Sequence, residues 1–346
     1  MLDWEPHNFF RGAPFMIARL SSLVFLGENS CRDVEWLNIS VNYTIDAFQA
    51  TRELRLCPSI FRPLIHWILP STRKLRKHLH AAREIVSKEI EKRAASRQLQ
   101  AHESPDALNW LHEASESFNL GFDQSYGQIG LSLVAIHTTS SLLTNVIYDL
   151  AAYPEYVQPL RDEIEEVLAE DDGLKKTSLF KLRLMDSVMK ESQRINPLAL
   201  AFLNRIAERQ VSLSDGTVIP KGATIVVSAH TFMDEAVYPN ASHFDGYRFY
   251  NKRLEPGSQH SYQLVTTSSQ HFAFGHGVHT CPGRFFAVNE SKILLIHLLL
   301  KYDWKFKGER KRPKNIEFGI ESIPDPSIEL LFRSREPEID LTALGE

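Results

Sequence analysis

The spacing of hydrophobic residues predicts a mainly helical chain. Apolar side chains recur every three or four residues over long stretches, which is the period of one face of an α-helix. The helices predicted in this way cover residues 16–24, 36–50, 72–98, 131–146 and 184–196, with another from Tyr153 and a last one from Arg284 to Leu300. The third is rich in lysine and arginine, which indicates a solvated face rather than a partner surface.

A smaller set of strands is predicted in the second half of the chain. The predicted strands are residues 211–214, 217–219, 223–227, 316–318 and 328–331. Asp215-Gly216 is a strong hairpin signal between the first two strands. Residues 322–326 contain two prolines and are predicted to turn the chain between the last two, which would then form a second hairpin. The predicted fold class is mainly α with a smaller β region.

No internal repeat, low-complexity tract or flexible linker divides the 346 residues, so a single domain is predicted for 1–346. Residues 1–15 carry Pro6 and Pro14 and are expected to form an irregular start. The strongest apolar run, 293–300, is too short to cross a membrane and predicts a core helix, so no membrane anchor is expected. A formal net charge of −4 argues against nucleic-acid binding, and three widely spaced cysteines give no disulfide framework.

The strongest chemical signal is the glycine-rich segment 274–283, which precedes the last predicted helix. Gly275 and Gly277 relax the backbone so that it can pass close to a flat ligand. Cys281 then lies at a helix N-terminus, where unpaired N–H groups and the positive end of the helix dipole stabilise a thiolate. Such a thiolate is a good axial ligand for iron. The other two cysteines are interpreted as ordinary core residues.

A second signal is a polar cluster inside the helix predicted at 131–146. His137 and Thr138 stand among apolar residues, and the small Ala135 leaves room beside the helix. Buried polar groups are costly unless they are satisfied, so the cluster indicates a pocket. The Thr138 hydroxyl can bond a carbonyl of the preceding turn and open a local bulge. From the residues alone, an ordinary hydrogen-bonded pair in the core is an equally good interpretation.

The cysteine segment resembles the haem-binding loop of the cytochromes P450, the haem-thiolate monooxygenases. The family pattern of Phe, Gly, Cys and Gly is matched by Phe274, Gly277, Cys281 and Gly283, and His279 stands where the family has a basic residue near a haem propionate. The resemblance implies haem b as the cofactor and the cysteine as the ligand of its iron. A thiolate ligand pushes electron density onto iron and favours O–O cleavage.

The polar cluster resembles the family's oxygen-activating helix, in which a small residue, an acid and a threonine stand over the haem. Ala135 matches the small residue and Thr138 the threonine, while His137 replaces the acid. A histidine can also relay protons, because its unperturbed pKa lies near neutrality. This Ala-Ile-His-Thr-Thr version resembles fungal enzymes that oxidise terpenoid and indole-type secondary metabolites.

Two further motifs follow in the family's order. Glu191 and Arg194 lie three residues apart on one helix face. Read alone they are a surface ion pair of little energetic weight. They match the family's Glu-x-x-Arg pair, which is buried beside the haem loop and completed by a second arginine. Arg248 is the candidate for that arginine, in a stretch that resembles Phe-x-Pro-x-Arg-Phe with Gly246 in place of the proline.

The resemblance also implies a substrate cavity next to the predicted sheet. The residues expected to line an apolar pocket are Leu198, Leu200, Phe202 and, at the tip of the C-terminal hairpin, Ile323. Arg205 is a possible contact to a haem propionate, and a solvated arginine at a strand edge is an equally good interpretation.

The resemblance covers residue 16 to the end and implies a cytochrome P450 fold that lacks the N-terminal anchor, the first sheet and the early helices. It implies a monooxygenase that inserts one oxygen atom from O2 into an apolar terpenoid or indole-alkaloid substrate, with electrons from an NADPH-dependent reductase. The implied location is the cytosolic face of the endoplasmic reticulum membrane, or the cytoplasm if the chain is unanchored. The alternative is a catalytically silent, truncated remnant that binds haem poorly or not at all. A structural protein with Cys281 as plain core would require four coincident motifs.

Overall fold

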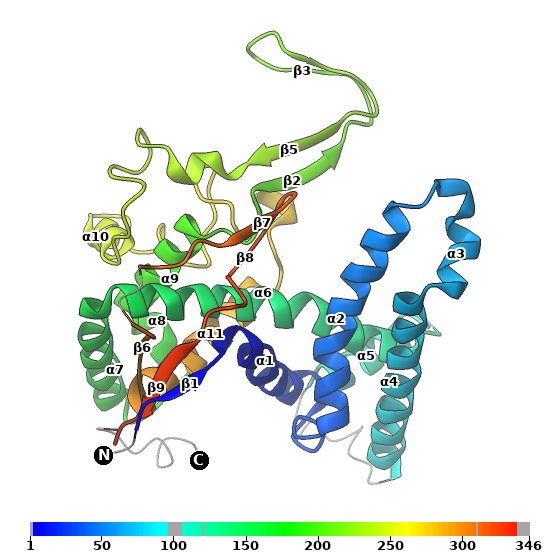
Figure 1. The fold of residues 1–346 in the computed structure, drawn as a ribbon, viewed down its shortest axis with the longest axis horizontal. Helices are drawn as coiled ribbons and strands as arrows, with labels where there is room; N and C mark the ends of the chain where they lie inside the picture. The colour runs from blue at the N-terminus through cyan, green and yellow to red at the C-terminus, as the bar shows by residue number, and fades with distance from the viewer. Residues whose placement is uncertain (1–2, 96–105, 120, 309–310, 338–346) are drawn as a thin grey trace. The chain divides into compact units, whose positions relative to one another are not determined.

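A computed structural model of the chain is mainly helical with a smaller β region, which confirms the predicted fold class (Figure 1). The structure describes residues 3–95, 106–119, 121–308 and 311–337. Its internal contacts divide the chain into two compact units: unit 1 comprises residues 1–10 and 141–346, and unit 2 comprises residues 11–140. Each unit is described by itself.

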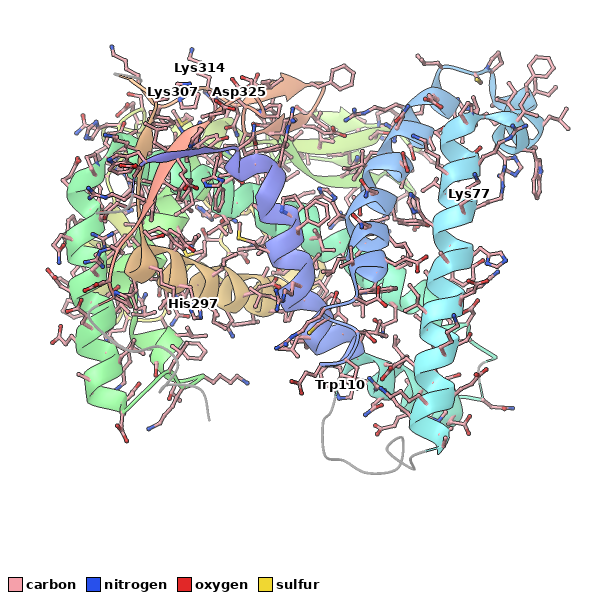
Figure 2. The ribbon with its side chains drawn as sticks, turned by 60° about the horizontal axis from the view of Figure 1, so that its bottom comes forward. Lys77, Trp110, His297, Lys307, Lys314 and Asp325 are labelled. Atoms are coloured by element: carbon pink, nitrogen blue, oxygen red, sulfur yellow. The ribbon has the colours of Figure 1, made fainter. Side chains whose placement is uncertain are left out.

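Unit 2 is helical. It contains most of α1 (Phe9–Leu26), then α2 (Val34–Arg55), η1 (Ser59–Phe61), α3 (Arg62–Ile68), α4 (Pro70–Ala95), α5 (Ala107–Ser117) and the first part of α6 (Gln124–Ala152). Trp36 is completely buried in its core with Leu26, Leu108 and Ile129, and the Trp36 indole donates to Ser22 Oγ at 2.9 Å. Figure 2 labels an exposed residue of α5, Trp110, and one of α4, Lys77.

The expected irregular start is wrong for the described residues. Residues 5–7 form strand β1, and α1 begins at Phe9 and runs through Pro14. A proline inside a helix removes one backbone hydrogen bond. Here Ala13 and Ile17 are both completely buried, and this burial of the helix face outweighs the lost bond.

Unit 1 carries the remaining helices and the strands. Its helical elements are the rest of α6, η2 (Pro154–Tyr156), α7 (Val157–Asp171), α8 (Ser178–Lys181), α9 (Arg183–Ile195), η3 (Ala229–Met233), α10 (Arg248–Leu254), η4 (Gly277–His279) and α11 (Arg284–Lys301). Residues Leu295, Ile296 and Leu299 of α11 are completely buried, so the core helix predicted from this apolar run is confirmed.

Nine short strands form four sheets in the described part of the chain. They are β1 (Glu5–His7), β2 (Ala201–Ile206), β3 (Val211–Ser212), β4 (Val218–Ile219), β5 (Thr224–Ser228), β6 (Tyr302–Phe306), β7 (Ile316–Phe318), β8 (Glu321–Ile323) and β9 (Leu330–Ser334). The sheet orders are β1-β9-β6, β2-β5, β3-β4 and β7-β8, and every pair is antiparallel. The predicted β3-β4 hairpin is confirmed, with Gly216 at φ +89° in its turn.

The C-terminal hairpin predicted from the two prolines is wrong. Strand β7 pairs with β8 across a turn at Gly319, whereas β9 pairs with β1 and β6. Gly319 has φ +63°, a left-handed conformation that glycine adopts without steric cost and that closes a tight turn. The segment 324–326 instead carries the chain from one sheet to the next.

Two helices have the length and hydropathy of a membrane span, which the search for uninterrupted apolar runs did not find. They are Phe9–Leu26 and Gln124–Ala152, each with a mean hydropathy of 1.3. About half of each apolar window is buried inside the protein, at 50% and 56%. Length and composition alone do not distinguish such helices from core helices.

Candidate functional site

The cysteine loop, residues 274–283, is closed by its own backbone. The Cys281 N–H donates to the Phe274 carbonyl at 2.7 Å, and this bond brings the two ends of the loop together. Gly275 has φ +78°, and a Cβ there would lie 2.9 Å from the His279 carbonyl oxygen. This position therefore requires glycine both for its backbone conformation and for space.

The sulfur of Cys281 is available to a ligand. The side chain is half-buried just before α11, and no hydrogen bond from the described residues engages its sulfur. A Cβ at Gly283 would lie 4.0 Å from that sulfur, an ordinary van der Waals contact. Around the loop, Val278 is 96% exposed and Phe285 is 46% exposed. Apolar side chains left uncovered beside a free sulfur fit a flat apolar group.

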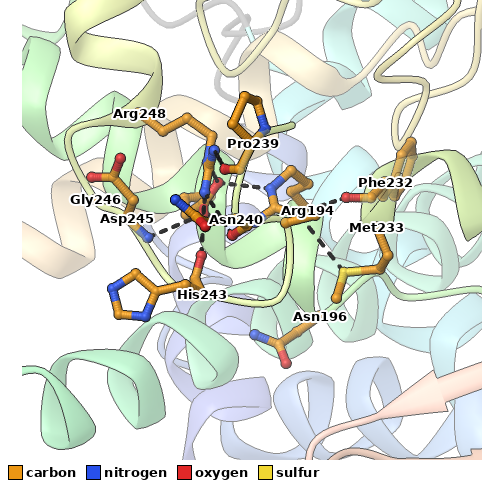
Figure 3. Close-up of polar contacts among 12 residues, drawn as sticks. Arg194, Asn196, Phe232, Met233, Pro239, Asn240, His243, Asp245, Gly246 and Arg248 are labelled. Carbon is orange, nitrogen blue, oxygen red and sulfur yellow. Dashed lines mark hydrogen bonds and ion pairs between the residues drawn. The ribbon is translucent and has the colours of Figure 1, made fainter. Parts of the chain in front are cut away.

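Glu191, Arg194 and Arg248 meet in one buried network, whose two arginines are labelled in Figure 3. Arg194 donates to both carboxylate oxygens of Glu191 at 2.8 Å, and Arg248 Nε lies 3.1 Å from both. Glu191 and Arg194 are 0% exposed, so the surface ion pair weighed from the sequence is wrong. Charges so deeply buried persist because each is paired and hydrogen-bonded.

The same network fixes loops of unit 1 as well as helices. Arg194 Nη1 donates to the Phe232 carbonyl at 2.6 Å, and Arg248 Nη1 donates to the Pro239 carbonyl at 2.8 Å. The Asp245 N–H donates to the buried carboxylate at 3.1 Å (Figure 3). One turn of α9 therefore holds the start of α10 and the irregular segment before it.

The polar cluster of α6 lies in unit 2. His137 Nε2 is 2.9 Å from the Val41 carbonyl, so its proton is directed there, and burial lowers the pKa of His137 below its ordinary value. The Thr138 hydroxyl donates to the Val134 carbonyl at 2.8 Å. Thr138 and Val134 are both exposed, while Ala135 is half-buried. The expected bulge is wrong: α6 is a continuous α-helix, because the threonine bond spans an ordinary helical turn.

Two of the residues expected to line an apolar pocket have different surroundings. Leu200 lines a cavity of about 790 Å³ between the end of α9 and the segment before β7. Most of its other lining residues are polar and include Asn196, Ser228, His230, Arg312 and Lys314. The Phe202 ring instead packs against Phe232 and Phe272, with ring centres 5.9 and 5.7 Å away. The cavity at Leu200 therefore has a mixed polar and apolar lining.

The remaining candidates lie at the surface or near it. Leu198 is half-buried and accepts the Ser322 N–H at its carbonyl, and Ile323 in β8 is 39% exposed. Arg205 is exposed in β2, and its guanidinium donates to the Asn204 carbonyl at 2.7 Å. This contact leaves the Arg205 head group at the strand edge.

Sequence reasoning missed a second group of buried charges in unit 1. Asp186 and Lys190 of α9 are buried and bind the chain segment around residue 264. Their sequence spacing looks like a solvated helix face, since charged residues at three- and four-residue intervals are usually exposed. The signal in the sequence that could have indicated their burial is that apolar segments both precede and follow α9. Packing of such segments leaves little of the helix surface for solvent.

Comparisons with known proteins agree on one family. The family model for cytochrome P450 matches residues 20–332. The cytochrome P450 monooxygenase hepE of Aspergillus oryzae is 42% identical over 339 residues, covering 96% of this chain and 62% of that protein. The cytochrome P450 monooxygenase calE of Penicillium decumbens is 43% identical over 329 residues, covering 94% of this chain and 63% of that protein.

A solved structure of a cyanobacterial CYP120A1 with bound retinoic acid shares the fold, with a TM-score of 0.68 at 20% identity, and covers 95% of this chain and 70% of that one. The chain belongs to the cytochrome P450 family. It spans less than two thirds of the length of hepE and calE. The cofactor of this family is haem with a cysteine thiolate as axial ligand. The free sulfur and the uncovered apolar side chains of the cysteine loop fit that group.

Proposed function

We propose that the chain is part of a haem-thiolate monooxygenase in which Cys281 is the axial ligand of the haem iron. The observation that carries this proposal is a cysteine loop that is closed by a hydrogen bond to Phe274, requires glycine at position 275 and leaves the sulfur without a hydrogen bond from the described residues. A loop built around an unused sulfur would have no purpose in a plain core. Bound haem would supply the activation of O2 that the side chains themselves cannot perform.

The chain's own residues would hold the cofactor and guide protons. His279 is exposed within the cysteine loop and would offer its ring to a propionate. Arg205 is exposed in β2, and the guanidinium nitrogens other than the one that donates to the Asn204 carbonyl would be its donors to a propionate. Thr138 donates its hydroxyl proton to Val134, which leaves the lone pairs of Oγ1 to accept a proton donor. Burial lowers the pKa of His137, and its ring is bound to the Val41 carbonyl, so we assign His137 to positioning α6 rather than to supplying a proton.

The proposed substrate is an apolar secondary metabolite of terpenoid or indole-alkaloid type. Two things support it: the Ala-Ile-His-Thr-Thr version of the oxygen-activating helix, and the similarity to fungal cytochrome P450 monooxygenases. The electrons would come from an NADPH-dependent reductase. Leu198 and Ile323 would contribute apolar surface to the substrate side.

Turnover tests this proposal. The chain, supplied with haem, NADPH and a fungal P450 reductase, should add one oxygen atom to a terpenoid or indole substrate. Labelled dioxygen should appear in the product. Thr138→Ala should divert electrons to hydrogen peroxide while haem content stays the same. If the haem-loaded chain consumes NADPH without oxidising any such substrate, the result would contradict the monooxygenase proposal and support the catalytically silent remnant.

We also propose that unit 2 contacts the cytosolic face of the endoplasmic reticulum membrane. Between the end of α2 and the start of α4, six apolar side chains are 52–88% exposed: Leu56, Ile60, Phe61, Leu64, Trp67 and Ile68. This apolar segment 56–68 is bordered by basic residues of α4, among them Arg73, Arg76 and Lys77 (Figure 2). The guanidinium of Arg76 lies 5.0 Å from the Trp67 ring centre. Exposed apolar and aromatic residues with a basic border suit an anionic lipid surface.

Vesicle flotation tests the membrane proposal. The full chain should float with vesicles that contain phosphatidylserine and bind them less at high salt. The double variant Leu64→Ser/Trp67→Ser should stay in the soluble fraction. Trp110→Ser is the matched control, because Trp110 is also a half-exposed tryptophan of unit 2 but lies on α5. Equal loss of binding in both variants would contradict a role for the apolar segment.

A further inference from the structure

A buried lysine holds an irregular segment of unit 1 by its backbone. Lys190 of α9 is 2% exposed, and its ammonium donates to the carbonyls of Gln263 and Thr266 at 2.7 and 2.8 Å. The same ammonium lies 5.4 Å from the ring centre of Phe249. Residues 259–273 contain no helix or strand, and only part of their backbone is hydrogen-bonded within the segment, as in the bond from Thr266 N–H to the Gln263 carbonyl.

An aspartate one turn earlier on α9 binds the same segment, but it accepts a hydrogen bond from a backbone N–H instead of donating to carbonyls. Asp186 accepts the N–H of Leu264 at 2.7 Å. It also pairs with Arg253 of α10 at 3.2 Å and with Lys292 of α11 at 2.7 Å. Asp186, Lys190 and Lys292 are all buried. This group and the Glu191 network both reach α10, through Arg253 and Arg248, and this group also holds residue 264 and α11.

These contacts reach both sides of the cysteine loop. On one side, the segment held at Gln263 and Thr266 continues to His271, whose ring stacks on Phe232 with centres 5.2 Å apart. The cysteine loop follows three residues later. On the other side, Lys292 belongs to α11, the helix that begins directly after Cys281. A single helical turn of α9 therefore fixes the chain before the loop and the helix after it.

We propose that Asp186 and Lys190 form a positioning clamp that sets where the cysteine loop holds its sulfur. The proposal rests on the proposed function only for its consequence at the haem. Its structural part concerns the backbone of residues 263–266 and stands without haem. Loss of the clamp should free this segment and weaken the attachment of α11 at Lys292, and the thiolate should then be held less firmly at the iron.

Hydrogen exchange of the full chain without haem tests the structural part. In Lys190→Met, the amides of residues 263–271 should exchange about tenfold faster, the effect of losing a buried hydrogen bond. Amides of α2 and α4 in unit 2 should be unchanged. Lys305→Met is the matched control, since Lys305 also lies over an aromatic ring, that of Trp4 at 4.3 Å, but belongs to β6. Unchanged exchange at 263–271, or equal acceleration throughout the chain, would overturn the clamp.

The haem-loaded chain tests the consequence. Lys190→Met should increase the fraction of the reduced carbon-monoxide complex that lacks the thiolate-type Soret band, and Lys190→Arg should restore part of it. Asp186→Asn provides a second variant if Lys190→Met does not fold, with faster exchange expected at the Leu264 amide. If the wild-type chain takes up no haem, the proposed function fails, while the exchange experiment still decides the clamp. A normal Soret band in both clamp variants would refute the positioning role.

Discussion

Replacing Arg194 by methionine should destabilise the protein more than removing one partner of an exposed ion pair. The side chain is 0% exposed and donates two hydrogen bonds to Glu191 and one to the Phe232 carbonyl. Methionine has similar length and no donor. The variant would therefore leave a buried carboxylate with Arg248 and the Asp245 N–H as its remaining partners.

The expected cost follows from this burial. Removing one partner of a buried ion pair costs about 3–5 kcal/mol, because the other charge stays desolvated without full compensation. That corresponds to a factor of about 10² to 10⁴ in the unfolding equilibrium. The carbonyl of Phe232 also loses its donor, which places the cost in the upper part of this range.

Urea titration followed by far-UV circular dichroism measures the effect. The midpoint should fall while the slope of the transition stays the same, since the unfolded surface is unchanged. Arg83→Met is the matched control. Arg83 also pairs with a carboxylate, Asp123, at 2.7 Å, but the two side chains are 48% and 37% exposed. Its loss should cost far less, because both charges of this pair are screened by solvent. An equal loss of unfolding free energy in the two variants would refute the conclusion that the network stabilises the protein because it is buried.

Three further predictions concern single positions. Gly275→Ala should cost more than Gly257→Ala in urea titrations, because both have positive φ (+78° and +80°) but a Cβ clashes at Gly275 alone; equal costs would contradict this. Burial, with Lys190 and Arg194 nearby, lowers the pKa of His271 well below its ordinary value, so the unfolded chain binds the extra proton and stability should fall as pH drops below about 6.5. His271→Gln should flatten that loss. Burial lowers the pKa of Lys190 to about 7, so between that pH and its unfolded value of 10.5 stability should rise with pH, and Lys190→Met should remove the rise.

The cysteine loop was predictable because all its determinants are contiguous. Gly275, Cys281 and the helix that follows them lie within a short stretch, and local backbone chemistry fixes their arrangement. The predicted β3-β4 hairpin succeeded for the same reason, since two residues specify its turn.

The clamp residues Asp186 and Lys190 were not predictable from their spacing. Their burial depends on segments that are distant in the sequence, such as the chain around Leu264 and helix α11. The predicted pairing of β7 was wrong for a related reason. The two prolines were a stronger local turn signal than Gly319, but the tight turn that forms requires a residue in the left-handed conformation, which Gly319 supplies. In α1, burial of the helix face overrode the proline signal.

The reduced carbon-monoxide difference spectrum of the haem-supplied chain tests the central claim most directly. The wild-type chain and Cys57→Ala, which alters another half-buried cysteine, should both show the Soret band typical of thiolate ligation. Cys281→Ala should lose that band. A thiolate-type band that survives in Cys281→Ala, or a wild-type chain that takes up no haem or shows only a band typical of imidazole ligation, would contradict the account.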